Sequence, residues 1–175
     1  MDVVVGFSNY SAGYQITDHI VNLNYKNIAF ATPTENFMKN ENRSKRRLNG
    51  YLSRMKEANL KTTILYYSIP MDHKKCGEEI FYQYKASKSK LDCIICGSEI
   101  SGTGFLSEIL FKGIKIPKSI GIAAVGNAEI TSLLQPQLTT IDFKVNEIGI
   151  IAANKLIDKI NNIKLKKKIF DVGIE

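Results

Sequence analysis

Three cysteines and a histidine lie at spacings that could hold a metal ion. His73-x2-Cys76 is followed after sixteen residues by Cys93-x2-Cys96, close to the spacing of a four-ligand zinc site. However, Cys93 and Cys96 lie in the apolar run 91–96, and strand residues three apart point to opposite faces. The same geometry disfavours a redox pair, which needs a helix N-terminus at its first sulfur. We therefore expect three buried thiols and no metal site.

A glycine-rich stretch and two histidines are the other candidates for chemistry. Residues 97–104 lack the Lys-Ser/Thr that completes a phosphate-binding loop, so we expect Gly102 and Gly104 to allow close helix packing instead. His19 falls inside an expected helix, and His73 lies in an expected loop beside no obvious nucleophile. A Ser/His/Asp arrangement stays open, because its members would meet only in the fold. A binding module is favoured over an enzyme, and no cofactor is expected.

Short β-branched runs alternate along the chain with longer stretches of helical period. Such alternation predicts a doubly wound α/β domain, in which a parallel sheet lies between two layers of helices. Ser98 is expected to cap one helix and Gly113 to end it. The expected strands are 3–7, 27–32, 63–67, 92–96 and 121–125, and the expected helices are 11–23, 42–58, 74–87 and 99–112.

The final third of the chain departs from this alternation. A short extended piece is expected at 138–143, then a long helix at 145–161 and one more strand at 169–172. The helix carries an apolar stripe that must be buried against a partner surface. This stripe consists of Ile148, Ile151, Ala152, the stem of Lys155, Leu156 and Ile160.

Composition and charge restrict the partners. The 175 residues, 44% of them hydrophobic, suffice for one packed domain. A net charge of +7 raises the question of nucleic acid. The lysines are nevertheless spread along the chain, with concentrations only at 39–47 and 155–168, and solvated faces are favoured. No apolar run reaches the ~20 residues of a membrane span, and the N-terminus is unlike a secretory signal, so a cytoplasmic protein without membrane contact is expected.

Five stretches resemble, in order, motifs of the LacI/GalR family of transcription regulators. They include Val-Gly-Phe-Ser-Asn-Tyr-Ser-Ala-Gly at 5–13, Arg-Arg-Leu-Asn-Gly-Tyr at 46–51 and Pro-Gln-Leu-Thr-Thr-Ile at 136–141. The other two are 24–30, which resembles a strand entry, and 113–122, which resembles the family's Gly-x-x-Val-Pro-x-Asp-Ile-Ser-Val signature. Within the family the chain most resembles gluconate-operon repressors, through 5–7, 91–96 and 170–173.

The resemblance implies a periplasmic-binding-protein-like type I lobe. Residues of about 8–142 would form the family's C-terminal lobe, and 143–162 a helix returning to an N-terminal lobe largely absent from these 175 residues. No helix-turn-helix is recognised, so operator DNA would be bound only through a headpiece outside the chain. The first half of the helix 99–112 matches a helix of the family's dimer interface, which implies a homodimer.

The same resemblance implies which residues bind the effector. Arg47 matches a helix arginine that contacts effector hydroxyls or carboxylate in relatives, and a guanidinium fork suits both groups. Asn9 would lie near the first crossing between the lobes. Ser98-Glu99 stands where the family usually has Asn-Asp, and Gly126 where many sugar binders have Asp. These departures suggest other polar contacts, so the expected set is Asn9, Arg47, His73, Ser98, Glu99, Gly126 and Asn127.

The function implied is that of a sensor for a sugar or a sugar acid such as gluconate. In an intact relative, effector binding would shift the balance between two arrangements of the lobes. Two alternatives remain: a fragment of a periplasmic-type solute-binding protein, which shares the fold, and a small α/β enzyme that uses His73.

Overall fold

The computed structural model describes residues 3–127, 129–163 and 167–175, which form two compact units. The larger unit is Asn9–Ile141, and the smaller contains residues 3–8 and Asp142–Glu175.

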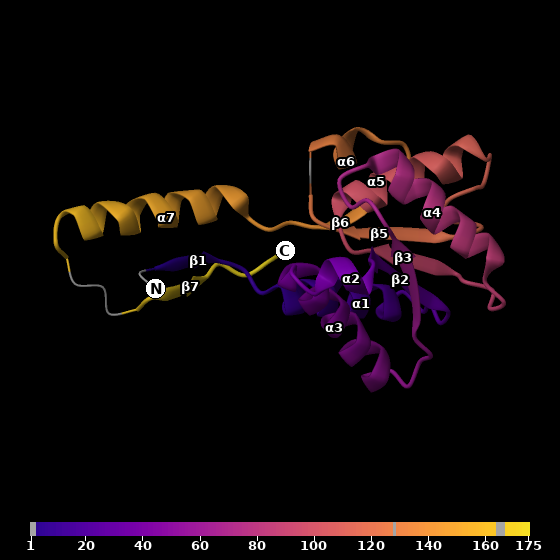
Figure 1. Ribbon diagram of the computed structural model, residues 1–175, viewed down its shortest axis with the longest axis horizontal. Helices are drawn as coiled ribbons and strands as arrows, with labels where there is room; N and C mark the ends of the chain where they lie inside the picture. Colours follow the sequence, from indigo (N-terminus) through magenta and orange to yellow (C-terminus); the bar gives the residue numbers. More distant parts are fainter. Residues whose placement is uncertain (1–2, 128, 164–166) are drawn as a thin grey trace. The chain divides into compact units, whose positions relative to one another are not determined.

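The larger unit is a parallel sheet between two helix layers (Figure 1). Its strand order is β3-β2-β4-β5-β6. Helices α1 and α3 cover one face, and α4 and α5 cover the other. The predicted three-layer α/β fold is confirmed. Its strands are β2 (Ile28–Pro33), β3 (Thr63–Tyr67), β4 (Cys93–Cys96), β5 (Gly121–Val125) and β6 (Thr139–Ile141). The main helices are α1 (Asn9–Asn22), α3 (Asn42–Glu57), α4 (His73–Ala86) and α5 (Glu99–Phe111).

The central strands form the middle of the core. Every residue of β2, β4 and β5 is buried, as expected for strands covered by helices on both faces. On α3 the apolar face is inward, with Tyr51 fully buried. The Tyr51 hydroxyl donates to the Ile28 carbonyl at 2.9 Å and accepts from the Thr63 amide at 3.0 Å. This side chain therefore ties α3 to β2 and β3.

Glycines let the helices of each layer approach backbone to backbone. A Cβ on Gly13 of α1 would collide with the Arg47 carbonyl of α3, and one on Gly50 with the Tyr10 carbonyl. On the opposite face, a Cβ on Gly77 of α4 would collide with the Gly104 carbonyl of α5, and one on Gly104 with the His73 carbonyl. The predicted packing role of Gly102 and Gly104 is confirmed, because Gly102 leaves no room for a Cβ beside Ala124.

Side chains at the helix ends satisfy free backbone groups. Ser98 caps α5 through a capping box with Ser101, and Gly113 beyond its end has φ +67°, so both predictions are confirmed. The N-cap of α3 is Glu41, whose carboxylate accepts from the amides of Arg43 at 3.0 Å and Ser44 at 2.8 Å.

The open edge of the sheet at β3 is covered by side chains of α4. The Gln83 amide oxygen accepts from the Tyr66 amide at 2.9 Å, and its nitrogen donates to the Tyr66 carbonyl. Glu79 accepts from the Ser68 amide just beyond the strand. Gln83 thus makes the pair of hydrogen bonds that a neighbouring strand would make.

Two short helices and one strand pairing differ from expectation. The helices α2 (Glu35–Met38) and α6 (Glu129–Leu133) are too short to show a period in sequence. The strand expected at 3–7 is β1 (Val4–Gly6), and it pairs in parallel with β7 (Ile169–Asp171) in a sheet of its own. Its strand character was predicted, whereas its partner was not.

The smaller unit consists of β1, β7 and the helix α7 (Val145–Ile160). The predicted stripe of α7 is only partly covered. Ile148, Ile151 and Lys155 are half-buried, whereas Leu156 and Ile160 are 59% and 69% exposed. Across the described residues, no helix has the length and apolarity that crossing a membrane requires.

The helix crossings lead to a stability prediction. We expect Gly13→Ala to lower the free energy of unfolding by about 1–3 kcal/mol, because the added methyl meets rigid backbone of α3. The control is Gly149→Ala on α7, where a Cβ meets nothing within 4 Å and helix propensity improves. Urea unfolding followed by circular dichroism would measure both, and equal stability of the two variants would contradict the crossing.

The Glu41 cap leads to a pH prediction. Burial raises the pKa of Glu41, but hydrogen bonds from Ser44 and Arg43 outweigh it and lower the pKa from 4.5 to about 2. The stabilisation is therefore complete above pH 4.5 and is lost as the pH falls from there towards 2. Glu41→Gln should cost about 1–3 kcal/mol of unfolding free energy at neutral pH and progressively less in acid. A cost that is the same at pH 6 and pH 3, measured by urea titration, would refute this.

Candidate functional site

Arg47 lies at the point in the sheet where the strand order reverses, between β2 and β4. The chain leaves β2 for α3 on one face of the sheet and leaves β4 for α5 on the other. In open parallel sheets this divergence leaves a crevice at the carboxyl ends of the two strands. Arg47 is on the second turn of α3, and its backbone is held by the close approach of Gly13. Its side chain extends to the end of β4.

Two hydrogen bonds fix the Arg47 side chain. Its Nε donates to the Asn9 Oδ1 at 2.8 Å, and its Nη1 donates to the Gly97 carbonyl at 2.8 Å. Asn9 is the first residue of α1, and Gly97 directly follows β4. The guanidinium therefore joins the start of α1 to the end of β4, and the structure brings together two of the predicted residues, Asn9 and Arg47.

The surroundings of Arg47 are desolvated but contain carboxylates. Burial lowers the pKa of Arg47, whereas Glu99 and Glu41 oppose this shift and Arg43 adds to it. An arginine remains charged under such a shift. Partial burial strengthens its attraction for an anion, because screening by water is weaker there.

Ser98 and Glu99 lie beside this arginine at the start of α5. The Ser98 hydroxyl is occupied by the cap, because it accepts from the Ser101 amide at 3.2 Å. Glu99 is half-buried in the first turn of the helix and acts on Arg47 electrostatically. Behind them, Tyr67 is 1% exposed. Its burial raises its pKa to about 12, against the lowering effect of hydrogen bonds with Ser101 and Ser98.

His73 lies on the other helix layer. It is the first residue of α4 rather than part of a loop, and its Nδ1 is 2.7 Å from the Thr103 Oγ1 of α5. Thr103 also donates to helix carbonyls, at 2.9 Å to that of Glu99. A cavity of 390 Å³ adjoins this pair, with Ile130 and Leu134 in its wall. The His73 ring thus makes its hydrogen bond with Thr103 of α5 and not with Arg47.

Gly126 and Asn127 follow β5. Gly126 has φ 114°, a conformation that residues other than glycine rarely adopt. The aspartate that the family resemblance suggests at this place would be strained on this backbone. Asn127 accepts through Oδ1 from Thr131 of α6 at 3.1 Å and from Thr140 of β6 at 3.4 Å. The Asn127 side-chain oxygen therefore links α6 and β6 to the residues that follow β5.

The cysteines do not form a reactive group. Cys76, Cys93 and Cys96 are buried free thiols. Burial raises the pKa of each, to about 12 for Cys76. Neutral thiols are poor nucleophiles and poor metal ligands. In the described part of the chain, no group of three His, Cys, Asp or Glu side chains is placed to hold a metal ion.

The assembled site has one fixed cation, one nearby carboxylate and the start of a capped helix. Such a set can bind a ligand that carries both an anionic group and hydroxyls, because the guanidinium binds the anion and the carboxylate accepts from hydroxyls. Gly97 and Tyr67 were not among the predicted site residues. The available signal was their position at a strand end, since Tyr67 is the last residue of β3.

Comparison with known proteins places this geometry in a family. The family model for the periplasmic binding protein-like domain matches residues 17–171. The NTD biosynthesis operon regulator NtdR of Bacillus subtilis is 26% identical over 95% of this chain and 50% of its own length. The regulator GntR of Escherichia coli is 24% identical over 99% of the chain and 50% of its own length. The chain thus spans about half the length of these curated relatives.

Solved structures share the fold. The regulator GntR from Chromobacterium violaceum superposes with a TM-score of 0.88 at 23% identity, covering 99% of this chain and 63% of its own. A LacI family regulator from Enterococcus faecium with bound ribose gives 0.81 at 17% identity, covering 97% and 61%.

The family match covers most of the chain, and the relatives and structural neighbours named above are described as transcription regulators. The chain belongs to the periplasmic binding protein-like domain family.

Proposed function

We propose that this chain forms one wall of an effector cleft and that the effector is a small sugar acid. The observation that carries the proposal is Arg47, a partly buried guanidinium fixed by Asn9 and Gly97 at the carboxyl ends of β2 and β4. Its charge would bind the carboxylate of the ligand. Glu99, on the facing helix, would accept hydrogen bonds from hydroxyls of the same ligand.

Two comparisons support a hydroxylated ligand. A structural neighbour holds ribose, and the resemblance to gluconate-operon repressors points to a polyhydroxylated acid. A neutral sugar would offer the Arg47 guanidinium only neutral hydroxyls, and hydrogen bonds to an ionised acceptor are stronger than those to a neutral one. A sugar acid satisfies both Arg47 and Glu99, and we therefore favour it over a neutral sugar.

Five further residues complete the proposed contact set. Asn9 orients Arg47, and Ser98 holds the start of α5, so both act mainly by positioning. Gly126 and Asn127 shape the loop after β5. His73 would contribute only to a ligand that extends towards Thr103.

We propose two further partners, DNA and a second copy of the chain, by analogy with the related regulators. DNA would be bound by a part of the protein outside these 175 residues, with the effector region biasing its geometry. A homodimer would form through the α5 side of the larger unit, where Phe111 is 81% and Leu133 73% exposed.

The relatives are transcription regulators, and we propose neither a cofactor nor a catalytic role for His73. We place the protein in the cytoplasm, as expected for a regulator of transcription.

The smaller unit would be completed by a second lobe. Leu156 and Ile160 on α7 are apolar and exposed, together with Val145 at 66%. We propose that residues 143–162 return to this lobe, whose remaining elements would cover that face. Replacing Leu156 and Ile160 by Glu should lower binding of the dye ANS to the chain while the unfolding of the larger unit stays unchanged.

Arg47 provides the direct test of the effector proposal. With gluconate at about 100 times Kd, the free energy of unfolding should rise by about 2.7 kcal/mol. Arg47→Met should abolish this rise, and Arg47→Lys should weaken it because the fork is lost. The matched control is Arg46→Met, an exposed arginine on the same helix, which should respond as the wild type does.

Thermal shift and calorimetry with gluconate, glucose, ribose and adenine would separate the outcomes. A shift confined to sugar acids supports the proposal. A shift with a neutral sugar that survives Arg47→Met would contradict the role of the arginine. Sequence-specific binding of an operator by these 175 residues alone would contradict the proposal that another part of the protein binds DNA.

A further inference from the structure

The two faces of the edge strand β3 are covered unequally. Leu65 and Tyr67 are buried in the core cluster that includes residues of α4. Ile64 and Tyr66 alternate with them along the strand, so they point to the other face, and both are only half-buried. A pocket of 410 Å³ lies on this second face, between β3, α3 and α2, and we call it the β3 pocket. Its volume is within the range of small-molecule sites.

The floor of the β3 pocket is apolar and fixed by the fold. Ile64, Leu48 and Met38 contribute to it, and the last two are buried. The backbone of Ile64 is held by its pairing with Phe30 of β2. The Thr32 hydroxyl of β2 donates to the Met38 sulfur at 3.5 Å. The floor is therefore already formed in the free protein, as in most sites for small molecules.

Three charged side chains also line the β3 pocket. Lys39 directly follows α2, and Lys45 lies in the first turn of α3. Both lysines are exposed, and within the described residues neither takes part in an ion pair. Glu35 of α2 is the third charged group. Two lysines against one glutamate give the described lining a net charge of +1.

The Glu35 carboxylate remains an acceptor. The Tyr66 hydroxyl donates to Glu35 Oε1 at 3.1 Å. Burial raises the pKa of Tyr66, and the hydrogen bond and the charge of Glu35 raise it further, so this hydroxyl keeps its proton at neutral pH. A carboxylate has room for several donors on its two oxygens. Glu35 can therefore accept one more hydrogen bond, from a group of a ligand.

We propose that the β3 pocket binds a small hydroxylated aromatic acid, of the chemical class that 4-hydroxybenzoate represents. The ring would lie on the apolar floor. Lys39 and Lys45 would bind the carboxylate through charge-assisted hydrogen bonds, and the phenolic hydroxyl would donate to Glu35. The single negative charge of the ligand balances the net charge of the lining. A sugar acid fits less well, because its many hydroxyls would be desolvated against an apolar floor.

The β3 pocket is separate from the effector crevice. Among the described residues, its lining includes neither Arg47 nor Glu99. The Arg47 side chain is instead hydrogen-bonded to Asn9 and to the Gly97 carbonyl. This proposal therefore stands apart from the proposed sugar-acid effector, and each can fail without the other.

Methyl NMR locates the ligand. The 175-residue chain, labelled with ¹³C at the methyl groups of Met and Ile, is titrated with 4-hydroxybenzoate. The Met38 and Ile64 methyl signals should shift and saturate along one binding curve. The control for non-specific apolar binding is Ile150 of α7, an exposed isoleucine outside the pocket, whose methyl signal should stay unchanged.

Two related compounds test the chemistry of the ligand. Benzoate lacks the hydroxyl that would donate to Glu35, and phenol lacks the carboxylate that would bind the lysines. Each loses a hydrogen bond with a charged partner and should bind at least about tenfold more weakly than 4-hydroxybenzoate. Calorimetry would measure the three affinities.

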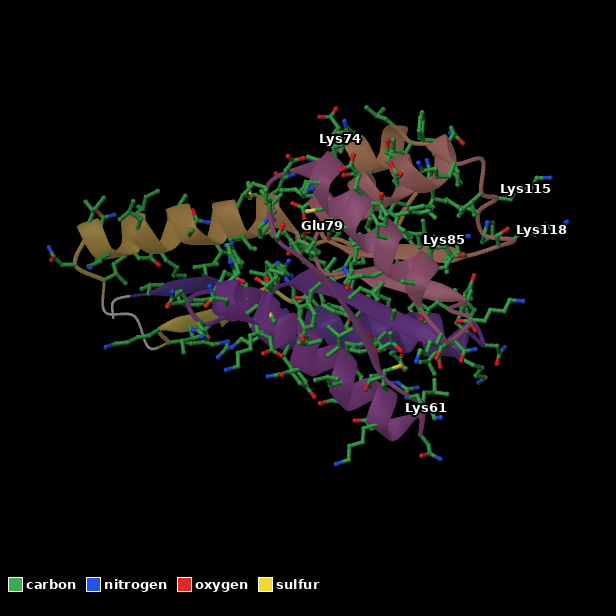
Figure 2. All side chains as sticks on the ribbon, turned by 45° about the vertical axis from the view of Figure 1, so that its right-hand side comes forward. Lys61, Lys74, Glu79, Lys85, Lys115 and Lys118 are labelled. Carbon is green, nitrogen blue, oxygen red and sulfur yellow. The ribbon has the colours of Figure 1, made fainter. Side chains whose placement is uncertain are left out.

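Matched variants test the residues. K39Q/K45Q should weaken the binding of 4-hydroxybenzoate at least about tenfold. Asn49→Phe should block it, because Asn49 is an exposed residue of the lining and the larger ring would fill the pocket. The control K115Q/K118Q also removes two exposed lysines. Figure 2 shows these in the loop between α5 and β5, and this variant should bind as the wild type does.

Four results would overturn the proposal. The first is the absence of a saturable shift at Met38 and Ile64 with millimolar 4-hydroxybenzoate. The second is an equal loss of affinity in the two double-lysine variants, which would assign binding to net charge. The third is binding of benzoate or phenol as tight as that of 4-hydroxybenzoate. The last is undiminished binding by Asn49→Phe, once circular dichroism has shown that the variants are folded.

Arg47→Met separates this site from the effector crevice. The variant should bind 4-hydroxybenzoate as the wild type does, even though its response to gluconate should be lost. Loss of both ligands in this variant would contradict two independent sites.

Discussion

The contact between helix backbones at paired glycines is the constraint on which this domain depends. Gly13 and Gly50 bring α1 and α3 together on one face of the sheet, and Gly77 and Gly104 bring α4 and α5 together on the other. Because the Gly13 crossing lies at the Arg47 carbonyl, the same contact sets the depth of the arginine. The position of the candidate site is therefore a consequence of helix packing.

Much of the fold could be predicted from periodicity. The strands Thr63–Tyr67 and Gly121–Val125 match the expected residues at both ends. Each is a short run rich in apolar residues that ends where Ser68 or Gly126 interrupts it. The partner of β1 could not be predicted, since strand pairing is set by tertiary contacts with residues 169–171 far along the chain. The short helices α2 and α6 could not be predicted, because a single helical turn shows no hydrophobic period.

The site was predictable in its parts but not in its connections. Family resemblance selected Arg47 and Ser98-Glu99, yet it did not indicate the hydrogen bond between Arg47 and the Gly97 carbonyl. The φ of 114° at Gly126 is a backbone property that a sequence suggests only through the glycine itself.

The side-chain cover on β3 affects how this domain can meet other chains. Exposed strand edges invite pairing with a strand from another molecule, which leads to aggregation or domain swapping. Here Gln83 occupies both backbone groups of Tyr66, and Glu79 takes the Ser68 amide. A foreign strand would have to displace these bonds before it could pair at this edge. Molecular recognition is thereby directed to helix surfaces and to the carboxyl ends of the strands, where side chains rather than main chain determine which partner is accepted.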